Sequence, residues 1–210
     1  MVKLRCKVGI VGDSTVGKTS LIKMFKERTF PNQYLMTIGS DLYTKTIDVP
    51  VVTNDQQQAE ISKDHQVELY LFDISGSSIY ESCYNEYIDG INAFIIVYDI
   101  TNPETFGNLS KWYRLCKSVR TSNTSMKKHD KSLIGVLVGN KVDMHTLEKV
   151  TQTQGEEFAK ECNLDFFLTS ANTDDGNVEQ PFLHIADTFY KSYLERIEEI
   201  KYVCENKRSK

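Results

Sequence analysis

The sequence has 210 residues, of which 40% are hydrophobic and 26% are charged, and its formal net charge at pH 7 is -4. A chain of this length can bury about 70% of its unfolded surface, which is enough for one domain with a single core. The acidic excess, 29 Asp and Glu against 25 Lys and Arg, argues against a nucleic-acid-binding protein. The five cysteines are scattered and form no CxxC pair, so we expect reduced thiols rather than disulfides or a zinc site.

The first predicted elements surround a candidate phosphate-binding loop. Residues 4–11 are a largely apolar run that predicts a strand, and residues 17–27 have the periodicity of a helix. The residues between them match the pattern GxxxxGK[ST] and read Gly12-Asp13-Ser14-Thr15-Val16-Gly17-Lys18-Thr19. A chance match on a glycine-containing turn is the alternative, but the strand–loop–helix setting favours a nucleotide site.

The residue types in this loop suit the binding of phosphates. Backbone N–H groups around Gly17 would point at the α- and β-phosphates, with the helix dipole behind them. The Lys18 ammonium would bridge the β- and γ-phosphates, and the Thr19 hydroxyl would bind Mg²⁺. We therefore expect the nucleotide to contact the loop and the start of the helix, at Asp13, Ser14, Thr15, Val16, Gly17, Lys18, Thr19 and Ser20.

Two strands with a long loop between them are predicted next. After a loop that follows the first helix, residues 41–52 alternate in polarity, which indicates a strand, and we expect Pro50 to end it. Residues 53–66 are polar and predict a long, solvated hairpin loop. Residues 67–72 alternate again, and this strand places Asp73 at its end.

The second half of the chain alternates between helices and strands. The continuous apolar run at residues 93–97 predicts a central strand that is buried on both faces. The other predicted elements are, in chain order, a short helix over 79–88, a helix over 103–120, a loop over 121–132, a strand over 133–138, a helix over 151–162, a strand over 165–168 and a long helix over 181–203. This alternation predicts an α/β fold in which helices cover both faces of a mostly parallel six-stranded sheet. Ligands of such sheets bind at the carboxyl ends of the strands, where the phosphate-binding loop lies.

The residues that follow the strand at 133–138 predict which base is bound. They read Asn140-Lys141-Val142-Asp143. The Asp143 carboxylate can accept hydrogen bonds from N1–H and the 2-amino group of guanine, and adenine offers neither donor there. We expect Asn140 to bind the phosphate-binding loop and the Lys141 side chain to lie over the purine ring. The predicted ligands are therefore GTP and GDP with Mg²⁺, and a P-loop ATPase or kinase is disfavoured.

A second base contact is predicted after the strand at 165–168. The residues there are Ser170-Ala171-Asn172, and the N–H of Ala171 would bind guanine O6. We expect all three residues to contact the nucleotide. Each motif alone is a weak signal, but a phosphate-binding loop, NKxD and this stretch in the right order are a strong one.

Together these motifs resemble those of the Ras-like small GTPases, and among them the Rab type, over residues 4–192. Residues 98–106 also resemble the Rab stretch that follows the fourth strand. The resemblance implies the P-loop NTPase fold of a small-GTPase domain. It further implies two switch loops that the γ-phosphate holds and that are released when it is lost.

The resemblance also implies roles for residues in and beside the two switch loops. Thr37 would bind Mg²⁺ and the γ-phosphate, and Asp73 would bind Mg²⁺ through a water molecule. The N–H of Gly76 would bind the γ-phosphate. The ring of Phe30 would pack edge-on against guanine, and Tyr34 is expected to contact the nucleotide as well.

One departure from the family concerns hydrolysis. The residue after Gly76 is normally the glutamine that orients the attacking water, and here it is Ser77. The serine side chain is shorter by two carbons, so it cannot both hold the water and reach the γ-phosphate. We therefore expect a GTPase with Lys18, Gly76 and Ser77 as its catalytic set and with slow hydrolysis. Asn172 replaces the usual Lys, which matters little because the base contact there comes from the backbone.

A narrower resemblance is to the Rab-like GTPase subunits of the intraflagellar transport B complex. It rests on residues 1–4, Ser77, residues 135–141 and a C-terminus without a prenylation signal. It implies a cytoplasmic protein of the cilium or flagellum and its basal body, with no direct lipid anchor. It also implies a stable heterodimer with a small β-sandwich subunit, number twenty-five of the complex, and contacts with other subunits of that complex. The alternative is a conventional Rab-type GTPase that cycles in vesicle trafficking, which Ser77 and the missing anchor disfavour.

The C-terminal helix is predicted to extend beyond the domain. We expect residues 1–192 to form the G domain, with the polar insertion at 53–66, and residues 193–210 to form a helical extension with a basic tail. An apolar stripe runs along the helix through Phe182, Ile185, Ala186, Phe189, Tyr193, Ile197 and Ile200. We expect its second half to dock a partner subunit, with fraying of the last turns as the alternative. Earlier in the chain, Tyr80, Tyr84 and Tyr87 fit either a partner surface or the core.

Overall fold

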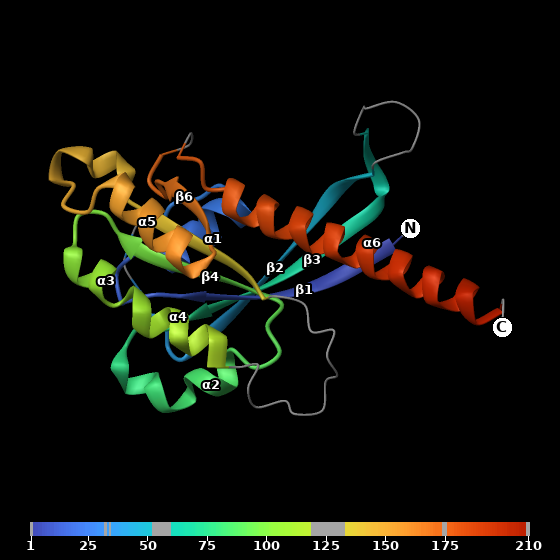
Figure 1. The fold of residues 1–210 in the computed structure, drawn as a ribbon. Coiled ribbons are helices and arrows are strands. Elements are labelled where there is room, and N and C mark those ends of the chain that lie inside the picture. Colours follow the sequence, from blue (N-terminus) through green and yellow to red (C-terminus); the bar gives the residue numbers. More distant parts are fainter. Residues whose placement is uncertain are drawn as a thin grey trace.

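The computed structural model describes residues 2–31, 33, 35–51, 60–118, 133–173 and 176–208. Tyr34, residues 53–59 and the loop predicted over 121–132 lie outside the described residues. Six strands form one sheet in the order β2-β3-β1-β4-β5-β6 (Figure 1). In chain order they are β1 (Val2–Val11), β2 (Ser40–Val51), β3 (Glu60–Ile74), β4 (Ala93–Asp99), β5 (Ile134–Asn140) and β6 (Asp165–Thr169). Only β2 and β3 pair antiparallel among these strands, so the predicted mostly parallel sheet is confirmed.

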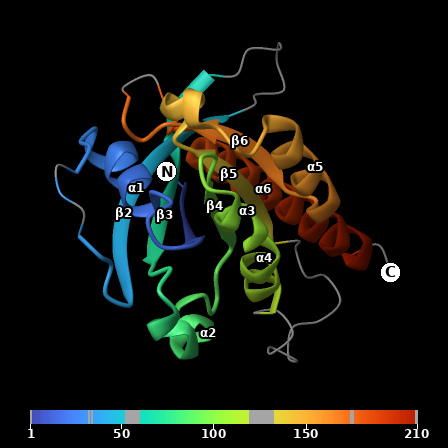
Figure 2. The same cartoon turned by 90° about the vertical axis from the view of Figure 1, so that its left-hand side faces the viewer.

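Helices cover both faces of the sheet (Figures 1 and 2). They are α1 (Lys18–Glu27), α2 (Tyr84–Tyr87), α3 (Pro103–Gly107), α4 (Leu109–Ser118), α5 (Gln152–Cys162) and α6 (Gln180–Arg208), with 3₁₀ segments η1 (Ser78–Cys83) and η2 (Val142–Leu147). One buried apolar cluster joins the sheet to α1 and α6, where the rings of Phe25 and Phe182 stack with centroids 4.1 Å apart. The other cluster joins it to α2, α4 and α5 and contains Tyr84 and Trp112.

The hairpin of β2 and β3 is longer than predicted. Residues 60–66 are the first part of β3, so the loop predicted over them is wrong. His65 pairs with Val2 of β1, and Gln66 pairs with Asp48 of β2. Glu60 and Ile61 pair with β2, and pairing with β1 begins at His65, so backbone pairing outweighs the polar composition that indicated a loop.

Pro50 does not end β2, contrary to the prediction. It pairs with Ile61, and the register shifts between Asp48 and Pro50. β2 lies at the edge of the sheet, where a residue without an N–H is tolerated because one side of the strand has no partner to receive it.

The helix predicted over 103–120 is interrupted. Asn108 separates α3 from α4, and residues 119 and 120 lie outside the described part of the chain. The backbone carbonyl of Asn108 accepts from the N–H of Lys111 at 3.0 Å and from that of Trp112 at 3.4 Å, so the closer bond is that of a turn tighter than a regular α-helix. The interruption turns the Asn108 side chain towards the phosphate-binding loop, where its amide donates to Asp13.

Two ambiguous apolar features are assigned by burial. Tyr84 is 2% exposed and belongs to the core, whereas Tyr80 and Tyr87 are partly buried and pack against the same cluster from its edge. The first half of α6 packs on the domain as predicted, through the stripe Phe182, Ile185, Ala186 and Phe189. The packing continues through Tyr193 and Leu194, and three exposed apolar residues, Ile200, Tyr202 and Val203, follow in the second half of the helix.

Candidate functional site

The phosphate-binding loop has the backbone shape that its sequence predicts. It connects β1 to α1, and Gly17 at the helix start has a φ of 101°. A Cβ atom on Gly17 would lie 2.2 Å from Nδ2 of Asn140, so glycine is required there both by conformation and by space. Thr15 also has a positive φ, 66°, which strains a β-branched residue. The loop is therefore held in a conformation that its own residues do not all prefer.

Lys18 is the first residue of α1 and is almost fully buried. Its Nζ donates to the carbonyl oxygens of Gly12 at 2.8 Å and Asp13 at 2.7 Å. Burial lowers the pKa of Lys18 to about 8, against the opposite effect of the nearby carboxylates of Asp73 and Asp13. A buried ammonium that donates to two backbone carbonyls is well suited to receive an anion.

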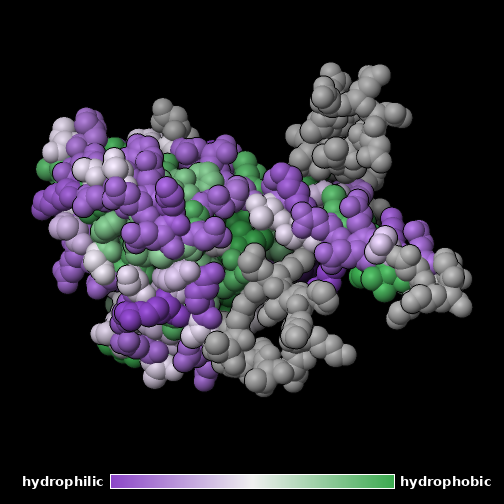
Figure 3. All heavy atoms as spheres, viewed as in Figure 1, coloured by the Kyte–Doolittle hydropathy of each residue, from purple (hydrophilic) through white to green (hydrophobic). Residues whose placement is uncertain are grey.

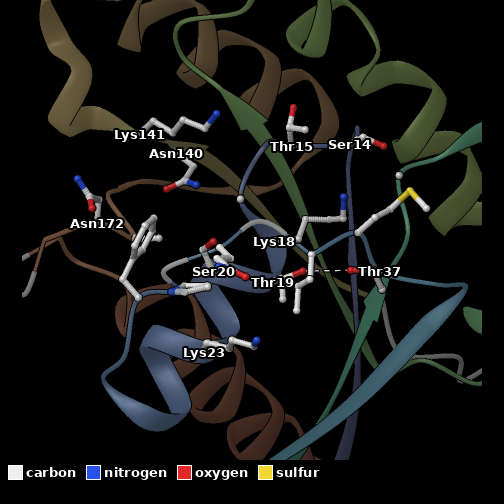
Figure 4. Close-up of a pocket in the computed structure, with 18 of the residues that line it drawn as sticks. Ser14, Thr15, Lys18, Thr19, Ser20, Lys23, Thr37, Asn140, Lys141 and Asn172 are labelled. Atoms are coloured by element: carbon white, nitrogen blue, oxygen red, sulfur yellow. Dashed lines mark hydrogen bonds between the residues drawn. The ribbon is translucent and has the colours of Figure 1, made fainter.

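Three oxygen-bearing side chains converge beside Lys18 from three elements. Oγ1 of Thr19 donates to Oδ2 of Asp73 at 2.5 Å, and Oγ1 of Thr37 lies 3.3 Å from the same oxygen. The two threonine hydroxyls are 3.2 Å apart, as the dashed line in Figure 4 shows. Asp73 is fully buried, and burial raises the pKa of its carboxyl group.

This oxygen cluster has the chemistry of a magnesium site. Oδ1 of Asp73 is buried and has no hydrogen-bond partner within the described residues. Hydroxyl and carboxylate oxygens are the ligands that Mg²⁺ prefers, and an unpaired buried carboxylate oxygen is a place where a cation lowers the free energy. No group of three His, Cys, Asp or Glu that could hold a metal occurs in the described ranges. The residues present therefore fit a hard cation such as Mg²⁺, held together with an oxygen-rich ligand.

Asn140 connects the two halves of the site. Its Nδ2 donates to the carbonyl of Val16 in the phosphate-binding loop at 2.8 Å, which is the contact predicted from the sequence. Its Oδ1 accepts from Oγ1 of Thr169 at 3.2 Å. Asn140 and Thr169 are both buried, so both halves of the amide are used inside the protein.

Asp143 is oriented by the loop that follows β6. Oγ of Ser170 donates to Oδ1 of Asp143 at 2.6 Å, and Nδ2 of Asn172 donates to Oδ2 at 3.3 Å. The Lys141 ammonium is held by a partly buried ion pair with Asp99, 2.5 Å away. Ser170 and Asn172 were predicted as nucleotide contacts, but their bonds to Asp143 and the role of Asp99 were not predicted, because such contacts depend on how the loops meet in space.

A cavity of about 630 Å³ runs from this loop to the phosphate-binding loop (Figure 4). Figure 4 shows Lys141 and Asn172 at one end and Lys18 and Thr37 at the other. The cavity is lined by most of the predicted site residues: Ser14, Thr15, Gly17, Lys18, Thr19, Ser20, Phe30, Thr37, Gly76, Asn140, Lys141, Asp143, Ala171 and Asn172. Its volume suits a small-molecule ligand of nucleotide size.

The other predicted residues support the cavity or lie next to it. Val16, Asp73 and Ser170 are buried behind its wall, and the side chain of Asp13 is turned away towards α4. Sequence reasoning did not identify further lining residues, among them Lys23, Pro31, Leu35, Met36, Asp41, Tyr43, Ser75 and Met144. These residues carry no motif, and only the folded loops bring them to the cavity.

Ser77 lies outside this cavity. It lines an adjacent, more open hollow of about 520 Å³, together with Ser78, Glu104 and Lys111. Gly76 lies between the two spaces, so close to the phosphate-binding loop that a Cβ atom would be 2.4 Å from the backbone of Asp13 and Ser14. The carbonyl of Ser77 accepts from the hydroxyl of Tyr84 at 2.9 Å.

Comparison with known proteins agrees with this geometry. The model of the Ras family matches residues 7–191. Intraflagellar transport protein 27 of Chlamydomonas reinhardtii is 34% identical over 206 residues, covering 97% of this chain and 93% of its own. The Mus musculus homolog of that protein is 35% identical over 200 residues, covering 94% and 97%. Ras-related protein Rab-13 of Bos taurus is 32% identical over 187 residues, covering 89% and 81%.

The fold adds one further constraint: within the described residues, no helix is both long enough and apolar enough to cross a bilayer. The match to the family model covers the phosphate-binding loop, both switch loops and the base-recognition loop. The six-stranded sheet and the position of the cavity agree with it. The chain therefore belongs to the Ras family.

Proposed function

We propose that this protein binds GTP and GDP together with Mg²⁺ and works as a Rab-like subunit of the intraflagellar transport B complex. Its place would be the cytoplasm and the cilium or flagellum with its basal body. The relatives that carry the name intraflagellar transport protein 27 support this proposal, since the similarity extends over nearly the whole of both chains. The match to the Ras family supports the binding of a guanine nucleotide.

The observation that carries the choice of base is the fixed Asp143 carboxylate at one end of the cavity. Ser170 and Asn172 each donate to one of its oxygens, which fixes the orientation of the carboxylate. Each carboxylate oxygen has a further lone pair for an N–H of the base. Guanine offers two donors in that position, whereas adenine would leave a desolvated charge unpaired.

Mg²⁺ would be held by Thr19 and Thr37, with Asp73 behind them. When bound, the ion neutralises charge on the β- and γ-phosphates. The contributions of the chain are then positional. Lys18 supplies a buried cation beside the phosphates, and the N–H groups of the loop hold the phosphate oxygens.

We propose slow hydrolysis for a reason that the second hollow supports. Ser77 lines that hollow rather than the nucleotide cavity, and its side chain is shorter than the family's glutamine. Orientation of the attacking water would therefore rest on the backbone of Gly76 alone. Since phosphoryl transfer depends on positioning, the intrinsic rate should lie below the Ras value of roughly 10⁻⁴ s⁻¹.

One purification tests both parts of this proposal. The tagged protein is isolated from ciliated cells, its bound nucleotide is extracted and identified, and the co-purifying proteins are analysed. We expect GTP or GDP together with transport-complex subunits. A preparation that carries ATP would contradict the base assignment, and one that carries vesicle-tethering proteins would favour the conventional Rab alternative.

That alternative has an observation in its favour. Leu35, Ile38 and Ile79 are exposed by 73%, 74% and 77%, and they lie in or next to the switch loops. Exposed apolar residues at such loops suit a partner that binds only one nucleotide state, as in a cycling Rab. A partner retained equally with GDP and with a GTP analogue would argue against cycling.

We further propose that the second half of α6 docks the small β-sandwich subunit, number twenty-five, as a heterodimer. Ile200, Tyr202 and Val203 are exposed by 55%, 69% and 51%. Figure 3 shows apolar surface at the far end of this helix, where α6 extends past the sheet. We treat residues 195–208 as the extension, because Tyr193 and Leu194 still pack on the core.

Co-expression with the partner tests this docking face. Replacing Ile200 and Val203 with Asp should abolish the heterodimer and leave guanine-nucleotide binding unchanged. Leu183→Asp is the matched control, since it alters an exposed apolar residue in the first half of the same helix. Full recovery of the partner with the Ile200/Val203 variant would show that α6 is not the interface. The switch loops would then be the next surface to test.

A further inference from the structure

Two partly buried hydrogen bonds join the phosphate-binding loop to Asn108 and to α4. The Asp13 carboxylate is turned away from the cavity and accepts two hydrogen bonds of 2.7 Å. Nε1 of Trp112 donates to Oδ1, and Nδ2 of Asn108 donates to Oδ2. Hydrogen bonds to a charged acceptor are among the strong ones in proteins, and here both carboxylate oxygens are used.

The orientation of Asp13 has an electrostatic reason. A carboxylate in a phosphate-binding loop would repel the phosphates if it faced them. The two donors hold it on the opposite side, while the carbonyl of the same residue accepts from Nζ of Lys18. Asp13 therefore links the cation that faces the phosphates to the side chains of Trp112 and Asn108.

Trp112 also contacts the segment that follows the second switch loop. The centroids of the Trp112 and Tyr84 rings are 5.2 Å apart, and both residues are 2% exposed. The Tyr84 hydroxyl donates to the carbonyl of Ser77 at 2.9 Å. Gly76, one residue earlier, rests on the peptide between Asp13 and Ser14. The loop and the segment thus meet twice, once through their backbones and once through Trp112.

We propose that Trp112 is a positioning residue that couples the phosphate-binding loop to the second switch segment, residues 76–84. Its N–H holds the loop through Asp13, and its ring holds the switch segment through Tyr84. The inference rests on the proposed function, because the coupled state is that of a bound guanine nucleotide. Trp112 is not among the residues that line the 630 Å³ cavity, so it acts through Asp13 on one side and through Tyr84 on the other.

The first test is a double-mutant cycle on the rate at which a fluorescent GDP analogue is released. Trp112→Phe and Asp13→Ala should each speed release by about tenfold to a hundredfold, the range of one lost charged hydrogen bond. The double variant should release the analogue no faster than the faster single variant, because the two changes break the same contact. Effects that multiply would show that Trp112 acts only through packing.

A neighbouring aromatic residue provides the matched control. Tyr113, also on α4, donates a hydrogen bond to the carbonyl of Cys162 at 3.1 Å, far along the chain from the loop. Tyr113→Phe removes one hydrogen bond from the same helix and should leave release within about twofold of the parent. Asn108→Ala removes the other donor to Asp13 and gives a second variant if Trp112→Phe does not fold.

The second test uses the fact that Trp112 is the only tryptophan in the sequence. A ¹H–¹⁵N spectrum of the full chain therefore contains one indole N–H resonance. We expect this resonance to move between the GDP complex and the complex with a non-hydrolysable GTP analogue. In Asp13→Ala it should lie upfield and stop responding to the nucleotide. A resonance that is identical in both complexes, or unchanged by Asp13→Ala, would overturn the inference.

The outcomes separate this inference from the function on which it rests. A parent protein that binds no guanine nucleotide overturns the proposed function and the coupling with it. A parent that binds GDP, combined with Trp112→Phe and Asn108→Ala variants that fold and release GDP at the parental rate, overturns the coupling alone.

Discussion

The two ends of the nucleotide cavity are built differently. At the base end, Asn140, Thr169 and Ser170 are each no more than 1% exposed. The Thr169 hydroxyl donates to Asn140, and the Ser170 hydroxyl donates to Asp143. At the phosphate end, Met36 and Ile38 of the first switch loop are 51% and 74% exposed. A preorganised end suits recognition of an invariant group such as the base. An exposed loop beside the phosphates suits a ligand group whose loss must release that loop.

The largest expected effect comes from changing Asp143, the carboxylate that we propose faces the base. Asp143→Asn replaces an acceptor with a donor opposite N1–H, and should weaken GDP binding by about a thousandfold or more. The same change should improve binding of xanthosine diphosphate, whose ring offers an acceptor there. Competition titrations with both nucleotides measure the shift.

Asp165→Asn is the matched control for that change. Asp165 is exposed at the start of β6 and pairs with His184, away from the cavity. Its variant should bind GDP like the parent. Equal losses in both variants would mean that Asp143 acts through stability rather than through the base.

A smaller effect is expected where the base end is tied to the phosphate-binding loop. Asn140→Ala leaves the Val16 carbonyl and the Thr169 hydroxyl without their buried partners. Each unpaired group costs about 1–3 kcal/mol, so GDP should be released roughly tenfold to a hundredfold faster. Stopped-flow release of a fluorescent GDP analogue checks this. Release at the parental rate would show that the Asn140 hydrogen bonds do not help to retain the nucleotide.

A change at the phosphate end should alter the rate of GTP hydrolysis rather than the affinity for GTP. Ser77→Gln restores a side chain long enough to orient a water molecule and should raise single-turnover hydrolysis about tenfold, with little change in GTP affinity. Ser78→Gln places the same side chain one residue later in the same hollow and should not help. If the parent already hydrolyses GTP as fast as ordinary Rab proteins, Ser77 does not limit the reaction.

The smallest effect concerns backbone strain in the phosphate-binding loop. Thr15 has a φ of 66°, which costs a β-branched residue roughly 1–2 kcal/mol. Thr15→Gly removes this strain but loosens the unfolded chain, so the net gain should be about 0.5–1 kcal/mol and a few degrees in Tm. A lower Tm for the variant would mean that the Thr15 side chain makes contacts worth more than its strain.

The sequence allowed the phosphate-binding and base-recognition loops to be predicted better than the parts of the chain around them. The loop 12–19 and the residues from Asn140 to Asp143 are linear motifs, and their chemistry follows from residue type and order. The tie from Asn140 to the phosphate-binding loop could be predicted for the same reason.

What could not be predicted depends on pairing between distant segments. The first part of β3 is a strand because β2 pairs with its first residues and β1 pairs with it from His65 on, although its composition indicates a loop. The helix after Pro103 breaks at Asn108, where the side chain reaches Asp13, which is 95 positions earlier. The place of Ser77 outside the cavity likewise follows from how Gly76 rests on the loop.

The central claim is that a rigid base end selects guanine while the phosphate end holds Mg²⁺ and the γ-phosphate. One competition measurement tests it directly: displacement of a fluorescent GDP analogue from the full chain by GTP and by ATP, with Mg²⁺ and with a chelator. We expect GTP to displace the analogue at least a thousandfold better than ATP in Mg²⁺, a preference that follows from the unpaired carboxylate that adenine would leave, and binding to weaken sharply in chelator. Equal competition by ATP, or binding that does not depend on Mg²⁺, would contradict the account.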